Sequence, residues 1–540
     1  MKSFTLLLLS ASIFLSGSCN QKKALTGPDG PAISAVNEVE AYSPVFPVLI
    51  GKENNPVFRI NIKVSETEEA PKVAGIRASL AGTTHLADLV SVKVFYTSGE
   101  PDFSEGDLFG ESAPQAEQLT ITGSQPLRPG DNYFWLSLSI NATADLLHKV
   151  GAEAIGVNLG AETLAIPTPE QPVPKRLGHA LRRYGDEGVD TYRIPGLATT
   201  NEGTLIAVYD IRYNSSVDLQ EDVDVGMSRS TDGGQSWEPM KIIMDMGEWG
   251  GRPQEENGIG DPAVLVDRQT NTIWVAALWA HGQPGQRTWW ASQPGISPET
   301  TGQLMLTKST DDGLSWSEPI NITKQVKKPE WFLAFQGPGK GITMEDGTLV
   351  FPAQFKDEEQ MPHSTLIYSK DRGETWHIGT GAKSNTTEAQ IVELSDGALM
   401  LNMRDNRGSG PNGRNGTGAR SVAITTDLGQ TWTEHSSSRE ALPEPVCMAS
   451  LISHSMEKNG KKLLLFSNPA DRYVRHNMTI KISEDEGFSW PEKYHTLVDE
   501  GTGRGYSCLT SIDENTIGIL YEGSQADLVF QKIRLEELME

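Results

Sequence analysis

Cysteine is scarce in this sequence: Cys19, Cys447 and Cys508 are the three cysteines among 540 residues. If Cys19 belongs to an N-terminal signal segment, Cys447 and Cys508 form the one pair that remains for a disulfide. A single pair cannot hold together a chain of this length, so a disulfide scaffold is excluded. With 37% hydrophobic residues, the chain is long enough for two or three domains with cores of their own.

Positive charge is also in short supply. The chain has 46 Lys and Arg against 71 Asp and Glu, which gives a formal net charge of −25. Such a chain repels phosphate backbones, so nucleic acid is excluded as a partner. The overall balance does not decide the ligand of a local site, because a basic pocket can lie inside an acidic protein.

The apolar run Thr5–Leu15 is too short to span a membrane. Lys2 precedes it and small residues follow it, so residues 1–19 are predicted to be a secretory signal. Cys19 comes next, which resembles a bacterial lipoprotein signal, but that pattern prefers Leu where Ser16 stands, so ordinary signal cleavage stays open. We expect an exported protein, either a periplasmic or outer-membrane lipoprotein tethered through lipidated Cys19, or a secreted one.

Residues 20–170 are predicted to form a small β-sandwich. They contain short β-rich runs separated by Gly, Pro, Asp and Ser, without a long helical period. These runs are Val57–Val64, Val73–Leu80, Leu89–Tyr96, Tyr133–Ile140 and Ala154–Leu159. An exposed aromatic residue here could bind carbohydrate, but Trp135 lies in an alternating run and is predicted to be core. Pro167, Pro169, Pro172 and Pro174 then mark an extended linker.

After the linker, the motif Ser/Thr-x-Asp-x-Gly-x-Ser/Thr-Trp occurs five times. Its aspartates are Asp232, Asp311, Asp371, Asp427 and Asp485. A period of about 60 residues is typical of propellers and other repeat folds. The Asp can hydrogen-bond the backbone of its own turn, the Gly permits positive φ, and the Trp can pack between neighbouring units. The motif is therefore interpreted as a structural element of turns.

A second periodic feature is a turn followed by an apolar strand. It occurs six times, starting at Asn201, Asn271, Asp346, Asp396, Asn459 and Asn515. Five boxes and six such hairpins over residues 175–540 predict an all-β domain, a six-bladed β-propeller with four strands per blade. The blade without a box is expected to be closed by strands from both ends of the domain.

The hairpin between Thr386 and Asp405 is the most informative of the six. Asp396-Gly397 between two apolar runs is a strong hairpin signal. A turn centred there pairs residues whose numbers sum to about 793, which places Glu388 beside Arg404. A lone pair of this kind would be interpreted as a surface ion pair, but the equivalent positions of the other hairpins are also mostly polar.

Eight to twelve positions before each hairpin turn stand Arg193, Asp261, Gln336, Glu388, Met448 and Tyr506. In a propeller, the first strand of each blade lines the central channel, so these positions converge on one end and form a candidate site. Arg193, Arg404 and Arg475 could bind a carboxylate there through charge-assisted hydrogen bonds. The carboxylates of Asp261 and Glu388 indicate that the rest of the ligand is polyhydroxylated.

Together with the Y-R-I-P segment at Arg193, G-D-P at Asp261 and G-Y-S at Tyr506, these features resemble the catalytic domain of bacterial exo-α-sialidases. The resemblance covers about residues 175–540. The N-terminal region is similar to the β-sandwich that accompanies some sialidases of gut Bacteroidetes. The departures are small: Thr425 replaces Ser in the fourth box, and Arg472 competes with Arg475 for the third arginine position.

The resemblance implies roles for individual residues. Arg193, Arg404 and Arg475 would hold the carboxylate of sialic acid. Tyr506 would be the nucleophile and Glu388 its general base, in a retaining double displacement. A neutral phenol avoids the repulsion that a carboxylate nucleophile would meet, and the arginines should lower its pKa.

The resemblance also implies that Asp218 is the acid/base, with Asp222 and Asp224 as neighbouring alternatives. Arg212 would be an accessory arginine beside the substrate, and Asp261 would lie near the N-acetyl group. No metal or cofactor is expected, since arginines meet the substrate charge and His281, His363 and His435 are isolated in sequence.

The implied activity is hydrolysis of terminal α-linked sialic acids from glycoconjugates. A trans-sialidase is the alternative enzyme, distinguished by whether water or a sugar accepts the glycosyl group. A non-catalytic glycan-binding propeller would keep the boxes and could keep the arginines. It would have no need for the Tyr506 and Glu388 pair or for Asp218.

Overall fold

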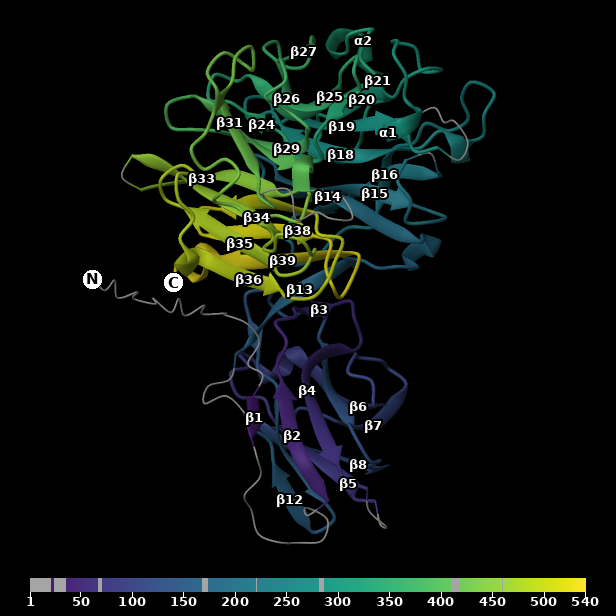
Figure 1. Ribbon diagram of the computed structural model, residues 1–540, viewed down its shortest axis with the longest axis vertical. Coiled ribbons are helices and arrows are strands. Elements are labelled where there is room, and N and C mark those ends of the chain that lie inside the picture. The colour runs from purple at the N-terminus through teal and green to yellow at the C-terminus, as the bar shows by residue number, and fades with distance from the viewer. Residues whose placement is uncertain are drawn as a thin grey trace, which may run out of the picture.

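The structure is a computed structural model that describes residues 21–23, 35–66, 70–167, 173–219, 221–280, 286–408, 418–458 and 460–540. Residues 1–19, with the predicted signal and Cys19, lie outside the described residues. In Figure 1 the N-terminal part, in purple and blue, lies below a larger part that runs from teal through green to yellow. Both parts consist mainly of β-strands.

The N-terminal part contains two sheets that share one hydrophobic core. All five predicted runs are strands, and Trp135 is 3% exposed, as predicted for a core residue. In strand order the first sheet is β1 (Gln21–Lys23), β2 (Val36–Tyr42), β4 (Asn55–Val64), β9 (Tyr133–Ile140), β6 (Leu89–Ser98) and β7 (Asp107–Ser112). The second is β12 (Glu162–Ala165), β11 (Glu153–Leu159), β5 (Lys72–Ser79) and β8 (Gln118–Pro126).

Five sheets follow one another in the C-terminal part. The first has β14 (Thr191–Thr199), β15 (Leu205–Arg212), β16 (Val223–Ser230) and β17 (Lys241–Met244); the second has β18 (Ile259–Val266), β19 (Ile273–Trp279), β20 (Gln303–Ser309) and β21 (Ile320–Asn321). The third has β22 (Leu333–Gln336), β24 (Ile342–Thr343), β25 (Leu349–Lys356), β26 (Pro362–Ser369), β27 (His377–Ile378) and β28 (Lys383–Ser384). The fourth has β29 (Thr386–Glu393), β30 (Leu399–Asp405), β31 (Ser421–Thr425) and β32 (Thr433–Glu434); the fifth has β33 (Ser450–Lys458), β34 (Lys461–Pro469), β35 (Met478–Ser483) and β36 (His495–Asp499). Their strands pair antiparallel except for β23 (Gly339–Lys340), which pairs with β18 in parallel.

The sixth sheet joins both ends of this part. It has β37 (Ser507–Asp513), β38 (Thr516–Tyr521) and β39 (Leu528–Arg534), and β39 pairs with β13 (Lys175–Arg182). This pairing confirms that the sheet without a box takes strands from both ends. Two strands of the N-terminal part, β3 (Val48–Ile50) and β10 (Lys149–Val150), also pair with β13.

The six predicted turn-then-strand segments are β15, β19, β25, β30, β34 and β38. Each is an interior strand of its sheet. Every residue of β15 and β25 is buried, which explains why these runs are almost continuously apolar and do not alternate. By contrast, β5 in the N-terminal part alternates between exposed and buried residues over much of its length.

The five boxes share one hydrogen-bond pattern. In the third box, the Ser369 hydroxyl donates to Asp371 Oδ1 at 2.8 Å, and the same carboxylate accepts from the backbone N–H of Thr375 at 2.9 Å. Each box Trp packs into a core shared by two neighbouring sheets, as for Trp376 with Trp274 of β19, at 6.0 Å between ring centroids. The predicted structural role of the boxes is confirmed.

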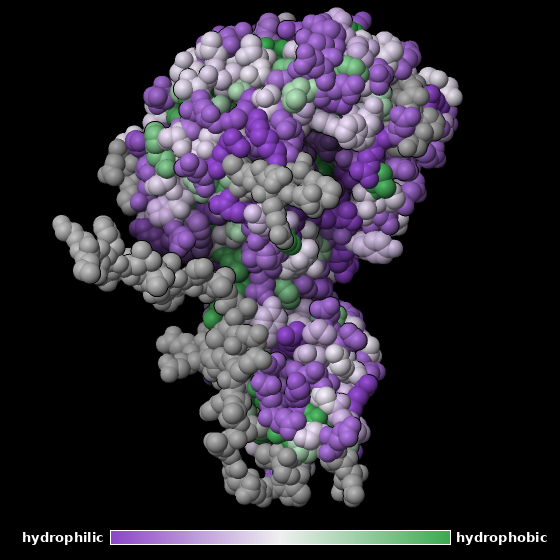
Figure 2. All heavy atoms as spheres, in the orientation of Figure 1, coloured by the Kyte–Doolittle hydropathy of each residue, from purple (hydrophilic) through white to green (hydrophobic). Residues whose placement is uncertain are grey.

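Helices in the described residues are short. They are α1 (Thr288–Ala291), α2 (Thr323–Val326) and α3 (Leu535–Met539), with 3₁₀ turns at Leu86–Asp88, Asp186–Gly188, Gln254–Glu256, Asn406–Gly408 and Glu492–Tyr494. None of the described helices is long and apolar enough to cross a membrane. Cys447 and Cys508 are both buried and free. The face seen in Figure 2 is mostly hydrophilic, with hydrophobic residues in small separate groups.

Candidate active site

Tyr506, Glu388 and Arg404 meet at one end of the six sheets, although they come from different strands and loops. The Tyr506 hydroxyl donates a short hydrogen bond to Glu388 Oε1. Arg404 Nη1 donates to Glu388 Oε2 at 2.5 Å and lies 3.0 Å from the Tyr506 oxygen. Tyr506 is 6% exposed, so a phenol and a carboxylate share a nearly dry contact beside a fixed guanidinium.

A β-bulge places Glu388 in this contact. Strand β29 pairs Thr387 with Arg404 and Ala389 with Met403, so Glu388 is the extra residue of the bulge. The sequence correctly predicts the hairpin and brings Glu388 near Arg404. The predicted register is off by one residue: paired residue numbers were expected to sum to about 793, but Glu393 pairs with Leu399, and these numbers sum to 792.

Buried side chains of neighbouring strands hold the bulge. The backbone N–H of Glu388 donates to Gln354 Oε1 at 3.2 Å, and its carbonyl accepts from Arg420 Nη2 at 3.4 Å. The fully buried Arg420 also donates to Asn402 Oδ1 at 2.7 Å and to the carbonyl of Cys447 at 2.6 Å. Arg420 thus connects the fourth sheet to the segment that precedes the fifth.

Arg193 and Arg475 lie beside the same tyrosine. Their guanidinium carbons are 5.3 Å and 5.7 Å from the centroid of the Tyr506 ring. Arg475 donates to the carbonyls of Arg504 at 2.9 Å and Val446 at 2.8 Å. The structure therefore brings Arg193, Arg404 and Arg475 together around Tyr506.

Arg472, the alternative third arginine, lies elsewhere. It is exposed, and its Nη1 donates to the carbonyl of Gly418 at 3.4 Å. The geometry therefore favours Arg475 as the third arginine beside Arg193 and Arg404.

Arg212 and Asp218 form a second part of the site. Fully buried Arg212 donates to Asp210 Oδ2 at 2.7 Å and to Asp218 Oδ1 at 2.9 Å. The Asp218 side chain is 51% exposed, so it can reach a ligand from solvent. Asp210 also accepts the backbone N–H of Asp261 at 2.8 Å, which ties the second sheet to the first.

Asp222 and Asp224, the alternatives to Asp218, do not contact Arg212. Asp224 is buried in β16 and accepts the Tyr213 hydroxyl at 3.0 Å. Asp222 accepts a long hydrogen bond of 3.5 Å from Gln254. The geometry therefore favours Asp218 for the role that the resemblance implies.

The innermost strands are strained where they reach the site. Ile194 and Asp261 have φ of 58° and 56°, and each lies at a register shift of its strand. Positive φ is costly for a β-branched residue such as Ile194. Its backbone N–H donates to Glu522 Oε1 at 3.1 Å, which helps to hold this conformation. Val446, before the fifth sheet, has a φ of 52°.

Burial dominates the electrostatics of the site. It raises the pKa of Tyr506 well above the ordinary value, the Glu388 carboxylate raises it further, and Arg404 and Arg475 lower it. The expected effect of the arginines is present, but burial and Glu388 outweigh it. Burial next to Asp218 and Asp210 likewise raises the pKa of Asp261 well above its usual range. Tyr506 is thus a neutral phenol until a base takes its proton.

Sequence reasoning missed Glu522, Asp210 and Arg420. Glu522 is buried and accepts Arg193 Nε at 2.9 Å and the Tyr506 backbone N–H at 3.0 Å. A signal for two of them exists: Asp210 and Glu522 each follow a Tyr at or near the end of the second strand of a hairpin. Arg420 has no comparable signal, because its partners are largely backbone carbonyls.

Comparisons with known proteins identify relatives of this chain. Residues 203–519 match the family model described as a BNR repeat-like domain, and residues 36–163 match the N-terminal domain of BNR-repeat neuraminidase. The chain is 46% identical over 538 residues to a sialidase of Bacteroides fragilis (strain YCH46), covering 94% of this chain and 97% of that protein. It is 32% identical to a sialidase of Micromonospora viridifaciens, covering 69% of this chain and 56% of that protein.

A solved structure gives the same result. The Hadza microbial sialidase Hz136 superposes with a TM-score of 0.84 at 45% identity, covering 92% of this chain and 99% of that chain.

Proposed function

The chain belongs to the family of BNR-repeat sialidases, and from that premise we propose that it is an exo-α-sialidase that hydrolyses terminal α-linked sialic acids of glycoconjugates. One observation carries the proposal: the Tyr506 hydroxyl, the Glu388 carboxylate and the Arg404 guanidinium are in mutual contact beside two further arginines. A non-catalytic binding site would need the arginines but not the buried phenol and carboxylate pair.

The proposed architecture is a six-bladed propeller. Contacts between the innermost strands support it: β14 contacts β18 and β37, β18 contacts β22, and β33 contacts both β29 and β37. The fourth sheet reaches the third through β25 and β29. The six sheets would then surround one axis, with Tyr506 near one end of it. A crystal structure with an open arc of sheets would contradict this arrangement.

In the proposed reaction, Arg193, Arg404 and Arg475 bind the carboxylate of the substrate. Asp218 gives its proton to the glycosidic oxygen while Tyr506 Oη bonds to the anomeric carbon and Glu388 takes the phenol proton. The leaving group departs as an alcohol. Water then attacks the glycosyl-enzyme, Asp218 accepts the proton of the water, and Glu388 returns its proton to the departing phenolate. Two inversions give retention of configuration.

Proton NMR during the first minutes of sialyllactose hydrolysis tests this scheme. The α-anomer of sialic acid should be released first and should then mutarotate to the β-form. Initial release of the β-anomer would exclude the double displacement. Formation of sialyllactose from an aryl sialoside and added lactose would identify a trans-sialidase, and binding without turnover would support the glycan-binding alternative.

The assignment of Asp218 has its own test in a pair of variants. Asp218→Asn should slow cleavage of sialyllactose much more than cleavage of an aryl sialoside, whose leaving group needs little protonation. Asp222→Asn makes the same charge change four residues away and should leave both rates near the wild-type values. If Asp218→Asn and Asp222→Asn slowed the cleavage of sialyllactose equally, the assignment of Asp218 as the acid would be wrong.

We also infer export and lipidation from residues 1–19. Cys19→Ala should move the protein from the membrane fraction to the soluble fraction and should abolish incorporation of labelled fatty acid. A wild-type protein that is soluble and unlabelled would instead indicate ordinary signal cleavage.

A further inference from the structure

A second pocket lies at the far ends of the innermost strands. Its wall takes residues from β14, β18, β24, β29 and β33, and its volume is about 260 Å³. On β18, Asp261 belongs to the active site and Val266 to this pocket. Five residues of extended strand span about 17 Å, so the two sites are well separated.

The segment between Gln336 and Lys340 fills the space between the two sites. It leaves β22 and forms β23 (Gly339–Lys340), which pairs with β18 and contacts β14 and β37. The Pro338 carbonyl accepts Gln390 Nε2 at 2.8 Å. A Cβ on Gly339 would lie 2.6 Å from Met448 Cε, and a Cβ on Gly196 would lie 2.5 Å from the Gly339 carbonyl oxygen. The segment is therefore tightly packed, and we call it the plug; it pairs with β18 between Asp261 of the active site and Val266 of the pocket.

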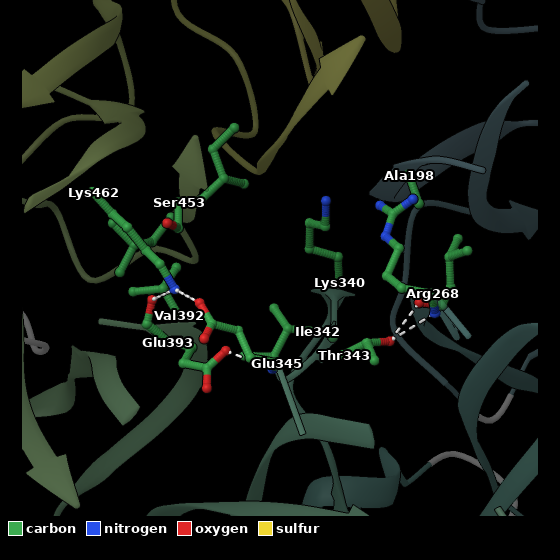
Figure 3. A pocket seen from close by; sticks show the side chains of 14 residues that line it. Ala198, Arg268, Lys340, Ile342, Thr343, Glu345, Val392, Glu393, Ser453 and Lys462 are labelled. Carbon is green, nitrogen blue, oxygen red and sulfur yellow. Dashed lines mark hydrogen bonds and ion pairs between the residues drawn. The ribbon is translucent and has the colours of Figure 1, made fainter. Parts of the chain in front are cut away.

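Lys340 extends from this plug into the pocket (Figure 3). Within the described part of the chain, its ammonium group forms no hydrogen bond or ion pair. Burial, together with repulsion from Arg268, lowers the pKa of Lys340 to about 8, so the group is still mainly charged at neutral pH. No described carboxylate forms an ion pair with this ammonium group.

Arg268 extends in a similar direction on the opposite side of the pocket (Figure 3). Its Nη1 donates to Asn201 Oδ1 at 3.2 Å, and its backbone N–H donates to Thr343 Oγ1 at 3.3 Å. Among the described residues, no carboxylate forms an ion pair with its guanidinium group. Arg268 is exposed and Lys340 is half-buried, so two cationic side chains line one cavity that is open toward solvent.

The acidic residues of the pocket are occupied by other partners. Glu345 forms an ion pair with Lys462 at 3.0 Å, and the Glu393 carboxylate accepts the backbone N–H of Glu345 at 2.9 Å. These contacts lie on the side of the pocket away from Arg268 (Figure 3). The side formed by Lys340 and Arg268 therefore has an excess of positive charge.

We propose that this pocket binds a small oxyanion, a phosphate or a carboxylate, between Lys340 and Arg268. Both cations prefer such acceptors, and the cavity has room for the anion and bridging waters. Because its wall is built from the innermost strands of five sheets, a bound anion stabilises the folded protein by mass action. Because the two sites are about 17 Å apart along β18, we expect this effect to leave hydrolysis unchanged.

Thermal unfolding of the full-length protein tests the proposal. Phosphate and acetate are titrated against chloride at constant ionic strength and pH 7. We expect phosphate, acetate or both to raise the wild-type Tm by at least about 1 °C at tens of millimolar. Lys340→Met and Arg268→Met should each lose most of this rise. The matched control is Lys324→Met, which removes the same charge from exposed helix α2 and should keep it.

The arginines around Tyr506 also attract anions, so hydrolysis is measured in the same samples. Inhibition of the wild type by phosphate reports binding at the active site, and Lys340→Met should retain that inhibition while losing the Tm rise. A wild type without any specific rise, or a Lys340→Met variant with the full rise, would overturn the proposal. If Lys340→Met does not fold, Arg268→Met gives the same decision.

Discussion

The two ends of the six sheets differ in how their carboxylates are held. At the box end, Asp371 accepts hydrogen bonds from Ser369 and Thr375, two and four residues away. At the active-site end, Glu388 is bonded to Tyr506, 118 positions along the chain, and Glu522 to Arg193, which is 329 positions away. At the box end, hydrogen bonds between residues close in sequence hold the carboxylates. At the active-site end, contacts between different sheets hold them.

The same contrast is seen in the pKa values. Hydrogen bonds to the charged form lower the pKa of Asp311, Asp371 and Asp427 to about 2. Burial and neighbouring acids raise the pKa of Asp224 to about 7 and that of Asp261 well above its usual value. The boxes stabilise the charged form of their carboxylates, whereas burial destabilises the charged forms of Asp224 and Asp261. Glu522 is the exception at the active-site end, because the Arg193 guanidinium lowers its pKa despite its burial. Such a difference is expected where acids serve structure at one end and chemistry at the other.

The largest expected effect is at Tyr506. Tyr506→Phe should lower kcat by more than about 10³-fold, because no other group can form the bond to the anomeric carbon, while the three arginines keep substrate binding intact. Steady-state kinetics with an aryl sialoside measures the loss. The control is Tyr494→Phe, which removes a hydroxyl that donates to Glu484 at 3.0 Å outside the site. A fully active Tyr506→Phe would remove Tyr506 from the role of nucleophile.

Arg420 tests whether contacts between sheets dominate stability at this end. Arg420→Met leaves Glu444 buried without its partner at 3.5 Å and frees the Glu388 carbonyl, so unfolding should become easier by about 3–5 kcal/mol. Urea unfolding measures the change. Arg420→Met combined with Glu444→Gln should recover part of the loss. A change as small as that of a surface mutation would contradict the proposed role of Arg420 in holding the bulge.

Asp224 gives a test by pH. Its native pKa of about 7 lies above the unfolded value, so the native state retains a proton between about pH 4 and 7 that the unfolded state has lost. Stability therefore falls as pH rises through this window. Asp224→Asn, whose side chain can still accept the Tyr213 hydroxyl, removes this pH-dependent contribution to the free energy of unfolding. Its stability relative to the wild type should rise from pH 4 to 7 by at most about 1.4 kcal/mol per pH unit. A constant difference across the window would contradict this account.

The smallest effect on stability is expected for a substitution in a single box. In contrast to Asp224, the contribution of a box aspartate is lost as the pH falls. Asp371→Asn should destabilise the protein by about 1 kcal/mol at pH 7, since it weakens a few local hydrogen bonds. The native pKa of Asp371 is lowered to about 2, so its contribution is lost as pH falls from about 4 toward 2. Wild type and variant should then converge in acid. The matched control Asp396→Asn lies in a hairpin turn without a box.

Much of the fold was predictable because its signals are local. The boxes, the hairpin turns and the buried strands each depend on residues within about ten positions of one another. Within the site, the contact between Glu388 and Arg404 was predictable because both residues belong to one hairpin. The bulge at Glu388 and the positive φ of Ile194 depend on packing between sheets, which no local pattern encodes. Glu522 has a local signal, but the hydrogen bond that it accepts from Arg193 joins two sheets and could not be predicted from it.

The sixth sheet has a consequence for biosynthesis. Strand β13 is made before the other five sheets of its part, and its partner β39 is made after them. At a synthesis rate of roughly 5–20 residues per second, the time between the synthesis of β13 and that of β39 is on the order of tens of seconds. During this time β3 and β10, which have already been synthesised, can pair with β13. β3 occupies the edge opposite β39, because His179 pairs with both Ile50 and Phe530, so the edge that receives β39 stays unpaired until β39 is made. A chain released before Leu528 would keep this edge of β13 unpaired.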